Sequence, residues 1–374
     1  MDTVNFDAIV IGAGIAGATV AAALALTHRT ALIEAEEAAG YHATGRSAAS
    51  WILNYGPPDV RALTGASRAF LETPPPGFSE APILRRRMNI YLAPPDQVGE
   101  LAAMLADGVG LREISIGDAK TLVPALRDGY AVRALVEEDV FDIDVAALHQ
   151  GFLRQARRNG GTLALRSRSM RIARQGGLWH VEVTGGAHFT AAILVNAAGA
   201  WGDEVASQAG FAPLGLVPKR RTGVIIDPAP WQVADWPFVM AADGSWYCRP
   251  EARTRLMVSP ADATPMPPQD IQPDEFDIAV AIDHMTAALD IEVKRVERSW
   301  AGLRTFTPDG SLALGRVGDG YFCCLGQGGY GIQTSPAVGA LVAALVTGTD
   351  PGYAPDVLAM VDPNRFAGRR APDQ

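Results

Sequence analysis

The sequence predicts an α/β fold in which two domains, each built around its own sheet, share the chain in alternating segments. Residues 6–11 form a continuous apolar run, typical of a strand buried on both faces, and a glycine-rich turn and an alanine-rich helix follow it. Residues 85–92 instead alternate between polar and apolar side chains, as in a half-buried strand. The chain of 374 residues is long enough for about two domains.

The first unit is a strand at residues 6–11, a helix to about residue 26 and a second strand at residues 30–34. A helix at residues 60–71 ends before the cluster Thr73–Gly77, whose three prolines and glycine break helical structure. We therefore place a crossing between domains near residue 80.

Helical and extended patterns then alternate, with a proline-rich loop at residues 263–273. The last helix covers residues 335–346, with Ser335 as its N-cap and Pro336 in its first helical position. The other predicted helices are 95–106, 144–158 and 276–289, and the other predicted strands are 170–173, 179–184, 192–196, 292–302, 320–325 and several within 218–260.

Composition excludes several functional classes. The chain has 32 Lys and Arg residues against 41 Asp and Glu residues, and it has no long basic run, so nucleic acid is not an expected partner. Cys248, Cys323 and Cys324 lack metal-ligand spacing, so we expect reduced thiols and no metal site. The apolar segment 6–26 contains glycines and no Lys or Arg precedes it, and no other segment is long and apolar enough to span a membrane. These features favour a cytoplasmic protein.

A G-x-G-x-x-G motif occupies residues 12–17, between the first strand and the first helix, and Glu34 ends the next strand. Gly12 permits the tight turn, Gly14 lets the backbone approach a pyrophosphate, and Gly17 lets the helix pack on the sheet. The helix N-terminus favours phosphate, and Glu34 would bind ribose hydroxyls. A glycine-rich turn without a ligand is the alternative. The charge of Glu34 disfavours a ribose 2′-phosphate but does not distinguish NAD from FAD.

Two further segments favour FAD. Residues 194–202, LVNAAGAWG, form a strand that ends in small residues, so its backbone can approach the same cofactor. Residues 326–333, GQGGYGIQ, form a glycine-rich turn before the last helix, whose free N–H groups and positive dipole end can stabilise negative charge on a reduced isoalloxazine ring. A simple NAD domain needs neither segment.

Together these segments resemble the D-amino acid oxidase superfamily of flavoenzymes over nearly the whole chain. The strings YHATGRSAA (41–49), PKRR (218–221) and WAGLRTFTPDG (300–310) most resemble the bacterial D-arginine dehydrogenase type. The resemblance implies hydride transfer from Cα of a D-amino acid to flavin N5, giving an imine that hydrolyses to a 2-oxo acid. It also implies a Rossmann-like FAD-binding domain (1–80, 143–215 and 307–374) and an interleaved α+β substrate-binding domain on an antiparallel or mixed sheet (81–142 and 216–306).

The motif and the resemblance together imply a cofactor-binding set. We expect FAD to be held without a covalent bond, although the string around His42 is similar to relatives that attach flavin through a histidine; the cysteine that sarcosine oxidases use corresponds to about Gly302. The expected cofactor-binding residues are Gly12, Gly14, Ile15, Gly17, Glu34, Ala35, Arg46, Ser47, Ala48, Met170, Ala198, Gly199, Trp201, Arg304, Gly329, Tyr330, Gly331, Ile332 and Gln333.

For the substrate, the resemblance implies side chains that clamp a carboxylate. Arg304 corresponds to the family's carboxylate-binding arginine, whose guanidinium can donate two parallel hydrogen bonds; a structural ion pair is the alternative. Arg221 corresponds to a second active-site arginine, unless it belongs to a solvated basic run. Tyr55 and Tyr247 correspond to tyrosines that flank the substrate, with core packing as the alternative, and Gln333 lies where side chains border flavin and substrate.

Arg87 bears on the choice of substrate. It stands where the D-arginine-preferring type carries a glutamate that recognises a cationic side chain, so we expect acidic or neutral polar D-amino acids to be preferred and D-arginine to be poor. The alternative is that Arg87 belongs to the run Arg85–Arg87 at an edge, because strand alternation does not say which face is inward.

Three functions therefore stay open. The leading one is FAD-dependent oxidative deamination of a D-amino acid, with an electron acceptor such as a quinone, a dye or oxygen. The second is oxidation of a secondary amine or small amine such as sarcosine, glycine or a cyclic amine, which needs the same clamp. The third is a flavin-binding redox sensor or assembly factor without turnover, which the presence of Arg304, Arg221 and both tyrosines disfavours.

Overall fold

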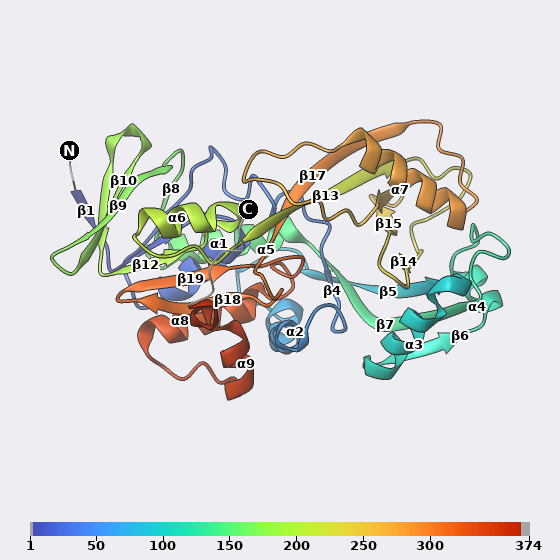
Figure 1. Ribbon diagram of the computed structural model, residues 1–374, viewed down its shortest axis with the longest axis horizontal. Coiled ribbons are helices and arrows are strands. Elements are labelled where there is room, and N and C mark those ends of the chain that lie inside the picture. The colour runs from blue at the N-terminus through green and yellow to red at the C-terminus, as the bar shows by residue number, and fades with distance from the viewer. Residues whose placement is uncertain (1–2, 368–374) are drawn as a thin grey trace.

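The computed structural model describes residues 3–367, whose strands form three sheets (Figure 1). The first sheet has six strands in the order β18-β19-β12-β2-β3-β8, and every neighbouring pair is parallel except β18 with β19. All residues of β2, β3 and β19 are buried, which explains their continuous apolar runs. The strands are β2 (Ala8–Ile11), β3 (Thr30–Ile33), β8 (Thr162–Ala164), β12 (Ile193–Asn196), β18 (Ala313–Gly318) and β19 (Tyr321–Leu325).

Helices cover one face of this sheet and share one apolar core with it. α1 and α8 cross so closely that a Cβ on Gly339 would lie 2.2 Å from Oγ1 of Thr19. α5 packs on the other side of α1, and α2 packs against α8 and α9. The helices are α1 (Ile15–Leu24), α2 (Pro58–Glu72), α5 (Val145–Arg158), α8 (Ser335–Thr347) and α9 (Pro355–Val361).

A four-stranded sheet covers the opposite face of the six-stranded sheet. Its order is β1-β11-β10-β9, and side chains such as Trp179 and Phe189 pack against Ile9 and Ile33. Short helix α6 (Gly202–Gln208) joins this core through Val205. The strands are β1 (Thr3–Asn5), β9 (Ser169–Gln175), β10 (Leu178–Val183) and β11 (His188–Ala191).

The third sheet has nine strands, in the order β17-β13-β16-β15-β14-β5-β7-β4 with β6 also paired to β7. Only β14 and β5 pair in parallel; the other pairs are antiparallel. The strands are β4 (Ser50–Trp51), β5 (Leu84–Ala93), β6 (Leu111–Ile114), β7 (Arg133–Ile143), β13 (Val217–Ile226), β14 (Phe238–Ala241), β15 (Tyr247–Glu251), β16 (Arg255–Ser259) and β17 (Val296–Phe306).

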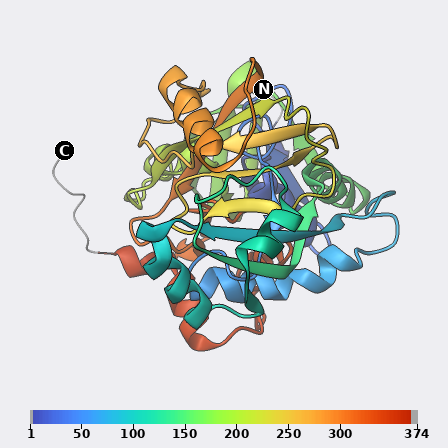
Figure 2. The same cartoon turned by 90° about the vertical axis from the view of Figure 1, so that its right-hand side faces the viewer.

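The two faces of the nine-stranded sheet have different partners. On one face α7 (Glu275–Ala288) and α4 (Ile116–Leu122) pack against apolar side chains such as Val224 and Val258. On the other face α3 (Val98–Asp107) covers only the end at β5 and β7, through Tyr91 and Leu135. Figure 2 shows α7, the orange helix, above the strands of this sheet. The remainder of the second face is therefore available for a site.

The fold is α/β with sheets of mixed orientation, as the sequence predicts. Several details differ from expectation, including those of β7, α8 and β17. β7 was not predicted, because Glu137, Glu138 and Asp139 interrupt its apolar pattern although they lie inside a long paired strand. The N-cap of α8 is Thr334, so Ser335 is the first helical residue and Pro336 the second. β17 has the predicted length but begins and ends four residues later than the predicted 292–302. Along the described residues, no helix combines the length and the apolar character that crossing a bilayer requires.

Candidate active site

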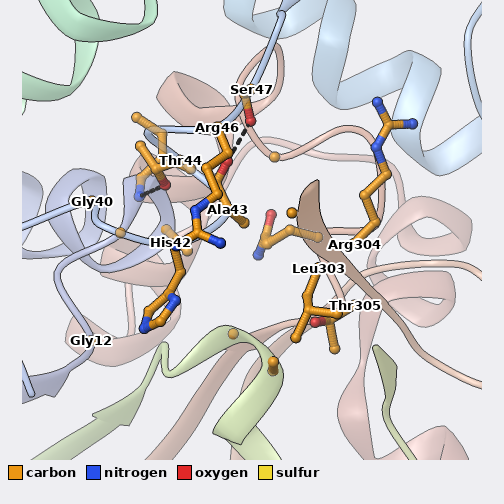
Figure 3. Close-up of a pocket in the computed structure, with 18 of the residues that line it drawn as sticks. Gly12, Gly40, His42, Ala43, Thr44, Arg46, Ser47, Leu303, Arg304 and Thr305 are labelled. Atoms are coloured by element: carbon orange, nitrogen blue, oxygen red, sulfur yellow. Dashed lines mark hydrogen bonds between the residues drawn. The ribbon is translucent and has the colours of Figure 1, made fainter. Parts of the chain in front are cut away.

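A cavity of about 650 Å³ is lined by residues of both the six-stranded and the nine-stranded sheet. One end meets the carboxyl ends of parallel strands β2, β3 and β12, where open α/β sheets bind ligands. The other end lies against β13, β15 and β17. Figure 3 shows the segment 40–47 on one side of this cavity and Leu303–Thr305 on the other.

The turn between β2 and α1 requires its glycines. Gly12 has a φ of +100°, and a Cβ there would lie 2.5 Å from the carbonyl oxygen of Ala197. A Cβ on Gly17 would lie 1.8 Å from the carbonyl oxygen of Gly12, so Gly17 packs helix against turn and does not line the cavity. Gly14 does line it, and its Cβ would meet only Oγ1 of Thr44, at 3.2 Å.

Glu34 braces this turn from the neighbouring strand. Its carboxylate accepts a hydrogen bond from the backbone N–H of Ala13 at 2.8 Å and a second from that of Glu36 at 3.0 Å. The side chain is almost fully buried and lines the cavity. The predicted acid is therefore at the cofactor end, next to the glycine turn.

Two residues that sequence analysis missed also hold this turn. Oγ1 of Thr44 accepts a hydrogen bond from the backbone N–H of Ile15 at 2.9 Å. Nε2 of His149, on α5, lies 2.9 Å from the carbonyl oxygen of Ala13, and burial lowers the pKa of His149, which favours a neutral ring that donates there. Thr44 lies in the recognised 41–49 string, but no local signal points to His149, because its contact joins residues 136 positions apart.

Other predicted cofactor residues gather around the same end. Nε2 of His42 lies 3.1 Å from the Glu36 carboxylate, and its ring centroid is 4.7 Å from that of Trp201. Arg46 lines the cavity, but its guanidinium donates to the carbonyl oxygens of Ile271 and Ala301 and pairs with Asp270, so it fastens the 263–273 loop. The remaining expected residues in the lining are Ile15, Ala35, Ser47, Ala48, Met170, Ala198, Gly199, Gly329, Gly331 and Ile332.

Side chains on one face of the nine-stranded sheet build the other end. Arg221 on β13 pairs with Gly302 on β17, so Arg221 and Arg304 are diagonal neighbours on the same face. Nη1 of Arg304 donates to the Tyr55 hydroxyl at 3.1 Å, and Nε of Arg221 donates to the carbonyl oxygen of Asp262 at 2.8 Å. Within residues 3–367 neither guanidinium has a carboxylate at ion-pair distance, whereas the adjacent Arg220 pairs with Asp277.

Tyr247 lies within electrostatic reach of both guanidiniums. Burial alone would raise the pKa of its phenol, but the charges of Arg304 and Arg221, together with hydrogen bonding to Ser259 and Arg221, hold that pKa below its usual value. Tyr55 and Tyr247 both line the cavity. The structure therefore brings together, in one positively charged recess, the four side chains that the resemblance suggested: Arg304, Arg221, Tyr55 and Tyr247.

Tyr330 and Gln333 support this recess. Tyr330 is absent from the cavity lining; its ring packs edge-on against Tyr55 at 4.9 Å, and burial raises its pKa to about 12. Gln333 lines the cavity, but its amide is occupied, since it accepts from the Ile52 backbone N–H and donates to Oγ1 of Thr64. A Cβ on Gly329 would lie 2.6 Å from the Tyr55 hydroxyl, so the glycine-rich turn touches the recess.

The expectation that Arg87 faces the substrate is wrong. Its side chain is only 8% exposed and is absent from the cavity lining. The guanidinium pairs with Asp142 at 2.7 Å and donates to the carbonyl oxygens of Ala234 and Trp236. Asp142 already neutralises the charge, so the preference for acidic or neutral polar substrates inferred from Arg87 has no structural basis.

Similarity to known proteins identifies the family of this chain. A family model described as FAD dependent oxidoreductase (DAO) matches residues 7–345. The chain belongs to this family. A curated relative, FAD-dependent oxidoreductase domain-containing protein 1 from Xenopus laevis, is 27% identical over 173 residues, which cover 41% of this chain and 34% of that protein. The match thus spans about a third of the length of that relative.

Solved structures of the DAO family share the fold. Glycine oxidase from Geobacillus kaustophilus superposes with a TM-score of 0.84 at 22% identity, over 97% of this chain and 100% of that chain. L-proline dehydrogenase from P. horikoshii has a TM-score of 0.82 at 21% identity, over 96% and 97% of the two chains. L-amino acid deaminase from Proteus vulgaris has a TM-score of 0.80 at 15% identity, over 98% and 99%.

The description of this family names FAD as its cofactor, and the residues present fit FAD. The backbone at Gly12 lies against Ala197 with no room for a Cβ, so the ends of β2 and β12 form one surface of exposed main chain. The cavity continues from this surface past the 326–333 turn to Arg304. It can hold a dinucleotide along its length and a small anion at its far end.

Proposed function

We propose that this protein oxidises the C–N bond of an amino acid, with a D-amino acid as its substrate. The observation that supports this most directly is the pair of guanidiniums, Arg304 and Arg221, at the far end of the cavity without a carboxylate partner in the described residues. A desolvated cation without a partner is costly, so the recess suits an anionic ligand.

Each side chain of the recess has a role in this proposal. Arg304 binds the substrate carboxylate through two parallel hydrogen bonds, with the Tyr55 hydroxyl beside its Nη1. Arg221 and Tyr247 complete the anion site from the neighbouring strands, and Tyr330 holds the Tyr55 ring in place. These contacts fix the orientation of the substrate Cα, and this positioning lowers the barrier to the reaction.

The glycine turns are the proposed cofactor contacts. The main chain of residues 12–17 and Glu34 would hold the ADP portion, and residues 326–333 before α8 would hold the isoalloxazine ring. When bound, FAD accepts the hydride that leaves Cα of the substrate. We also propose a cofactor-binding domain (1–80, 143–215 and 307–374) and a substrate-binding domain (81–142 and 216–306). Among the described residues this division follows the sheets, apart from β4 and the last residue of β7, which belong to the nine-stranded sheet.

We propose that FAD is bound without a covalent bond. Nε2 of His42 faces the Glu36 carboxylate at 3.1 Å, so one of its two ring nitrogens is engaged in a side-chain contact. Acid or heat treatment should release the yellow cofactor, and it should migrate as FAD. Flavin that stays with the denatured chain would contradict this assignment.

Oxidation of a small amine such as glycine, sarcosine or a cyclic amine is the second candidate. The solved structures that share the fold include proteins named glycine oxidase and L-proline dehydrogenase, and such substrates carry the same carboxylate.

An anaerobic screen that follows bleaching of the flavin absorbance separates these functions. The panel contains both enantiomers of alanine, leucine and methionine, together with glycine, sarcosine and proline. Bleaching by D-enantiomers and not by L-enantiomers supports the proposal, whereas bleaching by sarcosine or proline alone supports the second candidate. No bleaching by any member would indicate a flavoprotein that does not turn over amino acids. Oxygen consumption and dye reduction with the active compound then identify the class of acceptor.

A further inference from the structure

The floor of the substrate end is one face of the nine-stranded sheet, and the pairing of its strands determines which side chains share that face. Tyr247 on β15 pairs with Met240 on β14, and Phe238 on β14 pairs with Asn89 on β5. Because side chains two apart in a strand point to the same side, Arg221, Tyr247, Met240, Phe238 and Asn89 follow one another across this face. The substrate side chain, which begins next to the carboxylate clamp, must lie along this row.

The part of the row that lines the cavity beyond Tyr247, Met240 and Phe238, is apolar. Ile52, Phe238 and Met240 form one cluster with the rings of Tyr55 and Tyr247. All five line the cavity, and the Phe238 and Tyr247 ring centroids are 5.3 Å apart. The other acidic and basic side chains of the lining come from the segments around β3, β8 and α6 or from the 41–49 segment, and none of them belongs to this cluster: Glu34, Glu36, His42, Arg46, Arg168 and Glu204.

A polar cluster lies next to this apolar wall, outside the cavity lining. Asn89 is completely buried, its Nδ2 donates to the Tyr91 hydroxyl at 3.1 Å, and its Oδ1 has no partner among the described residues. The Tyr91 hydroxyl donates to Glu137 at 2.7 Å, and Nδ2 of Asn54 donates to the same carboxyl at 2.7 Å. None of these four side chains lines the cavity, whereas Phe238, which pairs with Asn89 across β14 and β5, does line it.

We propose that Ile52, Phe238 and Met240 form the side-chain subsite of this enzyme, that its preferred substrates are amino acids with uncharged apolar side chains, and that Phe238 excludes cationic ones by closing off the acceptors Asn89 and Glu137. A charged end group in this subsite would lose its water without gaining a partner, whereas an apolar chain gains contacts with the cluster. The inference rests on the proposed function, because it assumes that Arg304 and Arg221 hold the substrate carboxylate.

The first experiment compares substrates of similar length in the unmodified holoenzyme. D-Norleucine, D-lysine and D-glutamate have similar chains that end in a methyl, an ammonium and a carboxylate group. We expect kcat/KM for flavin bleaching to be at least about a hundredfold higher with D-norleucine than with D-lysine or D-glutamate. The free-energy cost of burying an unpaired charge is several times the free energy that corresponds to a tenfold change in kcat/KM. Equal or higher values with D-lysine or D-glutamate would overturn the inference.

If no amino acid bleaches the flavin, the proposed function fails, and unreactive acids then test the subsite separately. Hexanoate, 6-aminohexanoate and glutarate are titrated against the flavin absorbance. Tighter binding of hexanoate by at least about tenfold supports an apolar subsite. Equal binding of the three acids, or no spectral change with hexanoate, contradicts it.

The second experiment removes the Phe238 side chain from the apolar wall. Phe238→Ala should raise the ratio of kcat/KM for D-lysine to that for D-norleucine by at least about tenfold, because the ammonium then reaches Asn89 and Glu137. Adding Glu137→Gln should reverse most of this gain. Phe276→Ala, which removes an exposed phenylalanine on α7, is the matched control and should leave the ratio unchanged.

An unchanged ratio in Phe238→Ala protein that retains its flavin would show that Phe238 does not separate the two compartments. If Phe238→Ala loses its flavin, Phe238→Val is measured in the same way. The substrate series in the unmodified enzyme tests the inference without any variant.

Discussion

The two ends of the cavity are built from different parts of the chain. The cofactor end is built around a glycine turn at the ends of parallel strands, where Gly12 and Gly17 leave no space for a Cβ. The substrate end consists of side chains, with Arg304, Arg221 and Tyr247 projecting from three strands of the nine-stranded sheet. The first end therefore depends on the absence of side chains and the second on their identity, so mutations at the two ends should fail in different ways.

The largest effect is expected from Gly12→Ala. A Cβ at Gly12 would meet the Ala197 carbonyl at 2.5 Å, and a φ of +100° is strained for any residue with a side chain. The purified variant should contain almost no FAD, as measured by the ratio of flavin to protein absorbance. Gly99→Ala on α3, where a Cβ meets nothing within 4 Å, is the control and should retain its flavin. Full flavin content in Gly12→Ala would contradict the role of the turn.

Arg304→Ala should leave flavin content intact and abolish efficient turnover. Losing one partner of a desolvated ion pair costs on the order of 3–5 kcal/mol, so KM for the amino acid should rise by two to four orders of magnitude, roughly tenfold per 1.4 kcal/mol. Steady-state kinetics measures the change, and Arg295→Ala, at an exposed arginine, is the control. A normal KM would mean that the carboxylate binds elsewhere, with Arg221 as the next candidate.

Arg87→Gln should affect stability and not substrate choice. It leaves the largely buried Asp142 without its closest cation, although Nη1 of Arg249 lies 3.5 Å away and compensates in part. We expect a loss of about 2–3 kcal/mol in the free energy of unfolding, measured by urea denaturation, and an unchanged preference between D-glutamate and D-arginine. Arg85→Gln, at an exposed position of the same strand, should cost less than about 0.5 kcal/mol. A changed preference would place Arg87 in the pocket after all.

The smallest expected effect is a shift in pH dependence. Tyr247 is neutral below its pKa, and Arg304 and Arg221 hold that pKa below its usual value, so the alkaline loss of kcat/KM should begin at a lower pH than for an ordinary tyrosine. Arg221→Gln removes one of these charges, raises the pKa of Tyr247 and should move the alkaline limb to higher pH by up to about one unit. In Tyr247→Phe this limb should be absent. A limb that stays in place in both variants would assign it to another group.

The local pattern of residues predicted the cofactor end well. Strand, glycine turn, helix and acid occur within residues 8–34, and the need for Gly12 and Gly17 arises from backbone crowding at that turn, so the motif carries its own physical reason. The family resemblance added Arg304, Arg221, Tyr55 and Tyr247, and the structure places all four in the cavity lining. Thr44 was within reach of the same analysis, since it lies in a recognised string, whereas His149 was not.

The direction in which Arg87 points, and therefore its charge partner, was decided only by the tertiary structure. Alternation in β5 shows that the side chains of Arg87 and Asn89 point away from the face that carries Met88. Which of the two faces is buried depends on β7, whose Asp142 lies 55 positions from Arg87. The same applies to Arg304 and Tyr55, which are 249 positions apart. A glycine turn is determined by sterics among neighbouring residues and can be recognised locally. A recess of side chains depends on strand register and burial across the sheet, which no local segment contains.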